Sequence, residues 1–138
     1  FAIHHAAAAC LQDRIAYQCA DARRLPFGSN AFDVVFSNTI LHHLSDPRPV
    51  LLEICRVVRL GGTVLIRDLF RPPSRRRTEQ LVRQHATDAT APQQSMFFAS
   101  LCAAFTPEEI RNMLGDMHLG ELCVVIDSDR HMSIQTAR

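Results

Sequence analysis

The pattern of apolar and polar residues divides the chain into short elements that follow one another closely. Residues 14–20 carry apolar side chains at every second position and end at a polar pair, which is typical of a strand with one buried face. Residues 32–36 read FDVVF, and this apolar run predicts a second strand buried on both faces. Apolar residues then recur at helical spacing over residues 50–58 until Gly61-Gly62, the pair expected to end a helix. A third strand is expected at residues 63–66.

The order strand, helix, strand within so few residues indicates an α/β fold. A connection of this kind joins two parallel strands and is expected to be right-handed. Ser45 and Pro47 are the residues expected to begin the helix. Near the C-terminus, residues 121–126 and 131–136 are strand-like runs separated by a short polar turn, which predicts an antiparallel hairpin. The sheet should therefore be parallel except for one reversed strand.

The middle of the chain predicts helices rather than strands. Residues 71–105 are expected to form an insertion over the sheet edge, with helices near 78–85 and 96–105, and we expect the second helix to cover the mouth of a pocket. A further helix should begin at Pro107, behind a capping box, and stop near Gly120. The alanine-rich residues 1–11 are typical of the end of a helix.

Composition adds few constraints on the partner. The chain has 138 residues, 47% of them hydrophobic, and a formal net charge of +1, which fits one globular domain without a field that would select nucleic acid or an anionic membrane. No apolar run reaches the roughly 20 residues that span a bilayer, so a cytoplasmic protein is expected.

A cluster of basic residues lies near the start of an expected helix: Arg71, Arg75, Arg76 and Arg77. They form a solvated face, or bind an anionic group of a substrate; nucleic acid is not the expected partner because no aromatic platform accompanies them.

The cysteines and histidines do not predict a metal site. The five cysteines are widely spaced and form no C-x-x-C pair, so we expect them to be reduced and buried. His42 and His43 are adjacent and point in different directions, and no third ligand lies at a suitable spacing.

A set of short motifs, weak singly, is specific in its order. An Asp-Ala pair after the first strand is followed by L-P-F, FDVVFSNTILHHLSDP, E-x-x-R-V-x-x-x-G-G-T-V-L-I and the terminal hairpin. This order resembles the class I S-adenosylmethionine-dependent methyltransferases of the small-molecule type, most of all those of ubiquinone and menaquinone biosynthesis. The resemblance covers residues 14–69 strongly and residues 106–136 by order of elements.

The resemblance implies a Rossmann-like sheet with strand order 3-2-1-4-5-7-6 and strand 7 reversed. The glycine-rich cofactor loop and the first two strands of that fold have no counterpart in this sequence. We therefore expect residues 1–138 to form a partial methyltransferase domain, with the lid at about 71–105. Alone, this fragment should be inactive, bind the cofactor negligibly and be poorly soluble.

The candidate cofactor residues follow the strands, since ligands of doubly wound sheets lie outside the carboxyl ends of the strands. The resemblance implies that Asp21 accepts a hydrogen bond from the adenine amino group of S-adenosylmethionine, while the N–H of Ala22 meets a ring nitrogen. It also implies that Ser37 and Asn38 face the methionine part. The alternatives are a solvated Asp21 and a Ser-Asn pair that merely ends its strand.

The candidate catalytic residues are His42, His43 and Asp68. By resemblance, the histidines lie at the floor of a substrate pocket, although they also suit packing at a helix start. Asp68 could touch substrate or act as a base, or form an ion pair with Arg67 or Arg71. Methyl transfer mainly needs alignment in a dry site, so a base is required only if the acceptor must lose a proton.

The resemblance implies transfer of a methyl group from S-adenosylmethionine to a small-molecule substrate. A non-catalytic module that serves as a partner or scaffold is the alternative, and it predicts erosion of Asp21, Ala22 and Asn38, which are all present. A nucleic-acid methyltransferase would be expected to carry N/D-P-P-Y after Phe36, where this chain reads SNTI.

Overall fold

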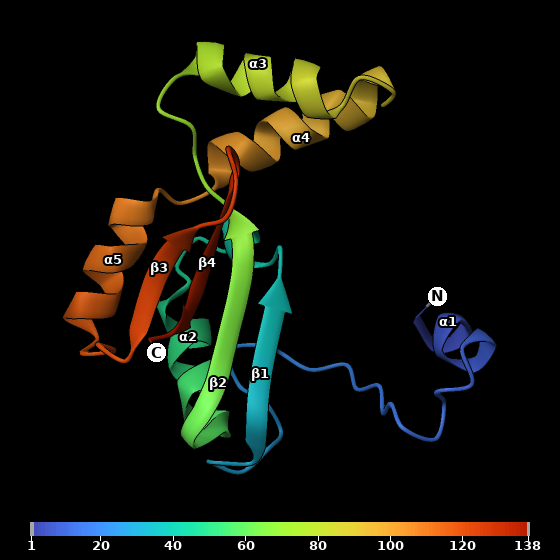
Figure 1. Cartoon of the computed structure of the whole chain (residues 1–138), viewed down its shortest axis with the longest axis vertical. Helices are drawn as coiled ribbons and strands as arrows, with labels where there is room; N and C mark the ends of the chain where they lie inside the picture. Colours follow the sequence, from blue (N-terminus) through green and yellow to red (C-terminus); the bar gives the residue numbers. More distant parts are fainter. Residues whose placement is uncertain (1, 138) are drawn as a thin grey trace.

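A four-stranded sheet forms the centre of the computed structural model, which describes residues 2–137 (Figure 1). Strands β1 (Phe32–Asn38) and β2 (Val58–Leu69) run parallel. Strand β4 (His131–Thr136) runs antiparallel to β2 and to β3 (Leu122–Ile126). The spatial order β1-β2-β4-β3 confirms the α/β fold with a reversed last strand and corresponds to the block 4-5-7-6 of the expected sheet.

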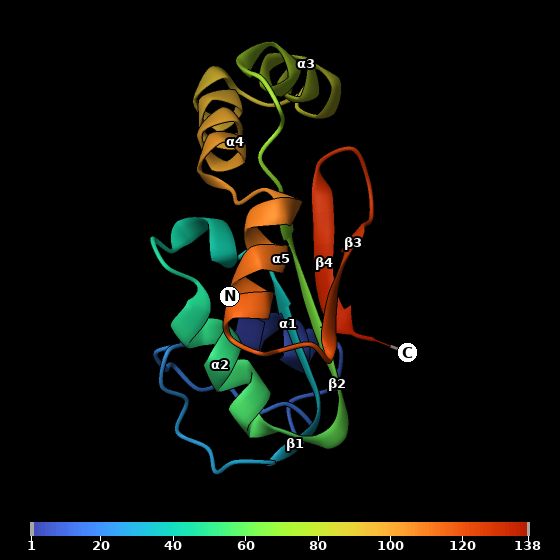
Figure 2. The same cartoon turned by 90° about the vertical axis from the view of Figure 1, so that its left-hand side faces the viewer.

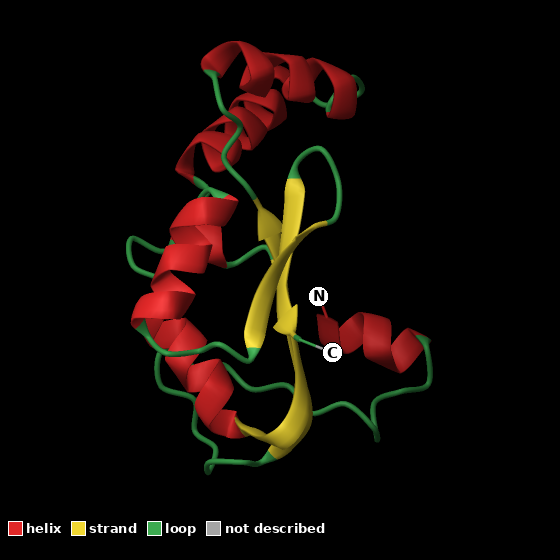
Figure 3. Ribbon diagram, turned by 60° about the vertical axis from the view of Figure 1, so that its left-hand side comes forward, coloured by secondary structure: helices red, strands yellow, loops and turns green. Residues whose placement is uncertain are grey.

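Two helices cover one face of this sheet. Helices α2 (Arg48–Val57) and α5 (Pro107–Asp116) lie on the same side of the strands, as Figures 2 and 3 show. Their apolar stripes pack against alternate residues of β2 and β4, and each large side chain buried in this way contributes about 1.5–3 kcal/mol. This core contains Leu41, Val50, Leu51, Ile54, Val64, Ile66, Ile110, Leu114, Met132 and Ile134.

The boundary between α2 and β2 differs from the sequence prediction. The helix has Pro47 rather than Ser45 at its N-cap, and it ends at Val57, before the glycine pair. Strand β2 then starts at Val58, because residues 58 and 63 already pair with β1 on either side of a register shift. Gly62 lies inside this strand, where a Cβ atom would stand 2.8 Å from the carbonyl oxygen of Asp33. Gly62 therefore permits a close approach of two strands, and neither glycine terminates the helix.

The strand predicted at residues 14–20 is not formed. None of these residues belongs to a strand, and Ile15 and Tyr17 are 39% and 45% exposed. An alternating pattern gives a strand only where a neighbouring strand supplies hydrogen-bond partners and a core supplies a buried face. The described residues place neither beside this segment, which runs as an extended connection from α1 (Ala2–Ala8) toward the sheet (Figure 1).

Strand β1 is buried on one face only, contrary to the prediction. Val35 packs against the core beneath the sheet, whereas Val34 and Phe36 are 57% and 77% exposed. Leu65 of β2 is the pairing partner of Phe36 and is exposed as well. The strand is also the last one in the sheet order, so one edge and one face of β1 remain open in this chain.

A pair of helices stands above the carboxyl ends of β1 and β2. Helix α3 (Arg75–His85) is capped by Ser74, whose Oγ accepts the N–H of Arg77. Helix α4 (Ala91–Ala103) starts at a capping box formed by Thr90 and Gln93. Both predicted helices are confirmed, and each begins earlier than predicted. They enclose a second, smaller core: Leu69, Leu81, Val82, Leu101 and Ala104.

The remaining sequence predictions have mixed outcomes. The capping box of α5 is present, with the N–H of Glu109 bound to Thr106 and the N–H of Thr106 bound to Glu109, although the helix ends at Asp116 rather than near Gly120.

The cysteines are free, as expected, but the prediction that they are buried is wrong. Cys10, Cys19 and Cys102 are exposed, since they lie outside both cores. No helix within residues 2–137 is long and apolar enough to cross a membrane.

Candidate functional site

The candidate site lies where β1 and β2 end beneath α4. Asn38 is the last residue of β1 and pairs with Arg67 of β2. Thr39 follows with a left-handed φ of 58°, and its N–H donates to the carbonyl oxygen of Arg67 at 2.8 Å. This conformation is strained for a β-branched residue, and it bends the chain away from the sheet into a short 3₁₀ helix, η1 (Leu41–His43).

A buried carboxylate holds η1 in place. Asp68 is 1% exposed, and its Oδ2 accepts the N–H of Leu41 at 2.6 Å. The other oxygen, Oδ1, accepts the N–H of Leu69 at 2.7 Å and lies 2.7 Å from Nδ1 of His42. Each oxygen is therefore used, and a buried carboxylate with this many donors is satisfied rather than reactive.

The contact with Asp68 fixes the state of the His42 ring. Since the carboxylate can only accept, Nδ1 carries a hydrogen, and in the neutral ring Nε2 then holds the lone pair. Nε2 makes no hydrogen bond to any residue in the range 2–137. Among these residues, every side-chain nitrogen or oxygen that is fully enclosed has a hydrogen-bond partner. Nε2 is therefore not fully enclosed and retains some access to solvent, although the side chain is only 6% exposed. The ring of His43 lies 4.0 Å from that of His42, and His43 itself is exposed.

Sequence reasoning selected His42 and Asp68 separately and missed their pairing. The two residues are 26 positions apart, and only the strand register brings them together. Because Asn38 pairs with Arg67, the chain that leaves β1 must pass the next residue of β2, which is Asp68. A prediction of the register between the parallel strands β1 and β2 would have revealed the pairing of His42 with Asp68. The alternative ion pairs of Asp68 are absent from the described structure, since Arg67 lies 3.6 Å from Asp127 and Arg71 pairs with Glu109.

Asp21 and Ala22 lie on a loop rather than at the end of a strand. The side chain and N–H of Arg23 bind the Asp21 carboxylate, with an ion pair at 2.8 Å, and these hydrogen bonds lower the pKa of Asp21 to about 2. The loop is attached to α2, since the N–H of Leu25 donates to Glu53 at 2.6 Å. No hydrogen bond joins Asp21 to Asn38 in the described part of the chain, so their position on one edge stays a prediction.

The chemistry of these groups nevertheless fits an adenosyl cofactor. Asp21 is ionised and exposed, and a carboxylate retains acceptor capacity for an adenine amino group beside its bonds to Arg23. The N–H of Ala22 makes no hydrogen bond within residues 2–137, so it is free to donate to a ring nitrogen. Ser37 is half-buried and Asn38 exposed at the end of β1, where both could face the methionine part.

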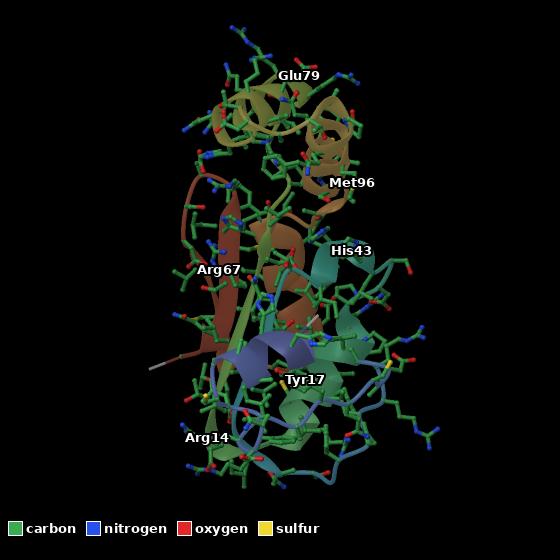
Figure 4. All side chains as sticks on the ribbon, turned by 90° about the vertical axis from the view of Figure 1, so that its right-hand side faces the viewer. Arg14, Tyr17, His43, Arg67, Glu79 and Met96 are labelled. Carbon is green, nitrogen blue, oxygen red and sulfur yellow. The ribbon has the colours of Figure 1, made fainter. Side chains whose placement is uncertain are left out.

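Helix α4 borders the site from above. It contacts η1, and Figure 4 shows Met96 of α4 above His43 on the same side of the molecule. Met96 is 70% exposed, while Phe97 and Phe98 pack on the second core. The segment is therefore helical and close to η1, which are two conditions that a lid must meet.

The arginine cluster is largely neutralised by its neighbours. Arg71 pairs with Glu109, Arg75 lies 3.1 Å from Glu79 and above the ring of Phe98, and Arg77 lies 3.8 Å from Asp129. These contacts favour the solvated, paired face among the alternatives that the sequence left open. No group of three metal-ligating side chains occurs among the residues that the structure describes.

A cavity of about 320 Å³ lies at the opposite end of the sheet. Its lining includes Asn30, which precedes β1, and Gly61 and Gly62, which lie in the amino-terminal part of β2. Thr136, the last residue of the antiparallel β4, also lines it. Ligands of open α/β sheets bind at the carboxyl ends of the strands, so this cavity is not the candidate site.

Comparison with known proteins gives the same family as the motifs. Residues 2–66 match the family described as a methyltransferase domain. The chain is 38% identical over 64 residues to 27-O-demethylrifamycin SV methyltransferase of Amycolatopsis mediterranei, a match that covers 46% of this chain and 24% of that protein. It is also 38% identical over 61 residues to demethylmenaquinone methyltransferase of Clavibacter sepedonicus, covering 44% and 25% of the two chains.

A solved structure extends the likeness to nearly the whole chain. The SAM-dependent methyltransferase of Aquifex aeolicus superposes with a TM-score of 0.65 at 17% identity, covering 98% of this chain and 60% of that one. At this identity the superposition establishes the fold alone. The matched segments span about a quarter of the length of the two curated relatives.

Proposed function

We propose that this chain, which belongs to the class I S-adenosylmethionine-dependent methyltransferases, is part of an enzyme that methylates a small molecule. The observation that carries the proposal is the carboxyl edge of the sheet. There the turn at Thr39 exposes Asn38, and the buried Asp68 fixes η1 beside it. The match of residues 2–66 to a methyltransferase domain supports this assignment.

S-adenosylmethionine is the proposed cofactor, and its sulfonium supplies an activated methyl group. Asp21 and the N–H of Ala22 would hold the adenine ring, and Ser37 and Asn38 would face the methionine part. The free acceptor and donor capacity of these groups supports the roles. The protein then mainly orients the acceptor and excludes water.

The acceptor side of the site is proposed to lie between η1 and α4. We take residues 1–138 as a partial methyltransferase domain and residues 71–105, which contain α3 and α4, as its lid. The contact between α4 and η1 supports this division. The ion pairs of Arg71, Arg75 and Arg77 favour a small molecule over nucleic acid. A cytoplasmic location, supported by the free cysteines, is part of the same proposal.

Calorimetric titration of the intact protein with S-adenosylmethionine tests the proposal. The wild type should bind, and Asp21→Ala should bind about 10- to 100-fold more weakly, as expected for the loss of a hydrogen bond to a charged group. Asp13→Ala is the matched control, because Asp13 is also an exposed aspartate of the N-terminal segment. An intact protein that does not bind the cofactor, or that binds it equally well after both substitutions, would contradict the proposal.

A further inference from the structure

Helices α3 and α4 form a body with a core of its own. Leu81 and Val82 of α3 and Leu101 of α4 are buried in one cluster, and within residues 2–137 Leu69 is the one member of this cluster that belongs to a strand. A unit that buries its apolar side chains internally keeps its packing when it moves as a whole. The helix pair can therefore move without disrupting the core beneath the sheet.

The two segments that connect this body to the sheet are joined to each other. The N–H of Arg71, two residues after β2, donates to the carbonyl oxygen of Phe105 at 3.1 Å, and the Arg71 side chain pairs with Glu109 of α5. Helices α3 and α4 extend beyond this point (Figure 1). Two connections held together in this way act as one hinge rather than as two separate anchors.

A second attachment comes from the turn between β3 and β4, and it is electrostatic. Nε2 of His85 lies 2.9 Å from Oδ2 of Asp129, and Nη2 of Arg77 lies 3.8 Å from the same oxygen. Arg77 and His85 stand four residues before and after the buried Leu81, so the inner face of α3 carries both groups. Asp129 therefore contacts α3 at both ends of the face that packs on the second core.

The turn that carries Asp129 is fixed to the sheet. Oγ of Ser128 accepts the N–H of His131 at 3.1 Å, which closes the turn. The carbonyl oxygen of Arg130 accepts the N–H of Phe70 at 3.0 Å, which ties the turn to the end of β2. Any movement of α3 relative to the sheet therefore changes the distance between Asp129 and the helix.

Asp129 is held in its charged form. Its pKa lies below the usual value for an aspartate, because His85 and then Arg130 hydrogen-bond to the carboxylate. Nη1 of Arg130 lies 3.0 Å from Oδ1 of Asp129 and 2.9 Å from Nε2 of His85. Since a carboxylate only accepts, we assign a hydrogen on Nε2 to the contact with Asp129, and Arg130 then donates to the carboxylate rather than to the ring.

These contacts are weak enough to break and form again. The side chains of His85, Asp129 and Arg130 are 22–28% exposed, and that of Arg77 is 40% exposed. Ion pairs that water reaches contribute little to stability singly and matter mainly as a network. The contacts therefore suit a reversible closure better than a permanent attachment.

We propose that the turn between β3 and β4 is a latch for the lid: Asp129 holds α3 through His85 and Arg77, and release of these contacts lets α3 and α4 swing open about the hinge at Arg71. The use of this motion rests on the proposed methyltransferase function. Helix α4 contacts η1, which follows Asn38 at the proposed methionine end of the cofactor site, so opening the lid uncovers that end. Asp129 acts on the site through the lid and is a positioning residue.

Hydrogen–deuterium exchange of the intact protein without ligand tests the latch itself. Asp129→Asn keeps the size of the side chain and removes its charge, so exchange in α3 and α4 should become about 3- to 30-fold faster, as expected for the loss of its pairs with His85 and Arg77. Exchange in α2 should not change. Asp127→Asn is the matched control, because Asp127 lies in the same turn but contacts Arg67 and Ser133.

A double-mutant cycle identifies the partner of Asp129. The effects of Asp129→Asn and His85→Ala on exchange in α3 should combine to less than their sum, because each substitution removes the same contact. Unchanged exchange in Asp129→Asn, an equal acceleration in Asp127→Asn, or additive effects in the cycle would overturn the latch.

Dissociation of labelled S-adenosylhomocysteine from the intact protein tests what the latch controls. Asp129→Asn should release this ligand about 3- to 30-fold faster than the wild type, and Asp127→Asn should stay within about twofold of it. Faster exchange in α3 and α4 with an unchanged dissociation rate would overturn the role of the latch at the site. A wild type that does not bind S-adenosylhomocysteine would instead contradict the proposed function.

Discussion

Replacing Asp68 with leucine should destabilise the intact protein strongly, although leucine has a similar size and suits a buried strand. The carboxylate is 1% exposed and accepts three hydrogen bonds. Two of the donors, the N–H of Leu41 and Nδ1–H of His42, come from η1 and lose their partner. The perturbation therefore acts on the attachment of η1 to the sheet.

The magnitude follows from those two donors. Each buried donor left without a partner costs about 1–3 kcal/mol, so the free energy of unfolding should fall by about 2–6 kcal/mol. This loss is reduced by the cost of burying a carboxylate, which is absent in the leucine variant. Asp68→Asn keeps one acceptor oxygen for these donors and should lose roughly half as much. The difference between the variants separates the effect of the hydrogen bonds from that of side-chain volume.

Urea unfolding followed by circular dichroism measures these losses. The midpoints should fall in the order wild type, Asp68→Asn, Asp68→Leu, with unchanged denaturant slopes. Ser74→Ala, which removes a surface helix cap, should cost about 1 kcal/mol and gives the scale of an exposed hydrogen bond. A leucine variant as stable as the wild type would refute the view that Asp68 anchors η1.

Three further predictions concern other parts of the fold. Gly62→Ala should cost about 1–3 kcal/mol in a thermal melt, because its Cβ would lie 2.7–2.9 Å from Val58, Asp33 and Arg59, whereas Gly120→Ala meets nothing within 4 Å and should be neutral. The N–H of Thr106, aided by Arg71, lowers the pKa of Glu109. The stability that the Glu109 carboxylate contributes is therefore complete above the unfolded pKa of about 4.3 and is lost as the pH falls through the lower folded pKa. The free energy of unfolding of Glu109→Gln, measured as the pH is lowered, should change less with pH than that of the wild type. Phe36→Glu should raise the solubility of the isolated 138-residue chain in a sedimentation assay, since Phe36 is 77% exposed on an open face; unchanged precipitation would contradict that role.

Elements with locally encoded ends could be predicted from the sequence. The capping box of Thr106 and Glu109 and the terminal hairpin depend on residues a few positions apart, and the structure contains both. The parallel pairing of β1 with β2 was predictable because a helix lies between the two strands, and a crossover of this kind joins parallel neighbours.

Elements that depend on distant partners could not be predicted in this way. The alternating pattern of residues 14–20 does not reveal whether a neighbouring strand exists, and the apolar β1 does not reveal how many of its faces are covered. The end of α2 at Val57 follows from the register of β2 against β1 rather than from the glycines. The His42–Asp68 pair likewise depends on that register, so only its members were predictable.

Hydrogen–deuterium exchange of the intact protein, with and without S-adenosylhomocysteine, tests most directly whether the carboxyl edge of the sheet binds the cofactor. The account predicts slower exchange at Ala22 and over residues 37–44, with no change around Gly61 and Gly62. Protection confined to the cavity beside those glycines, with residues 37–44 unaffected, would place the ligand at the opposite end of the sheet and contradict the account.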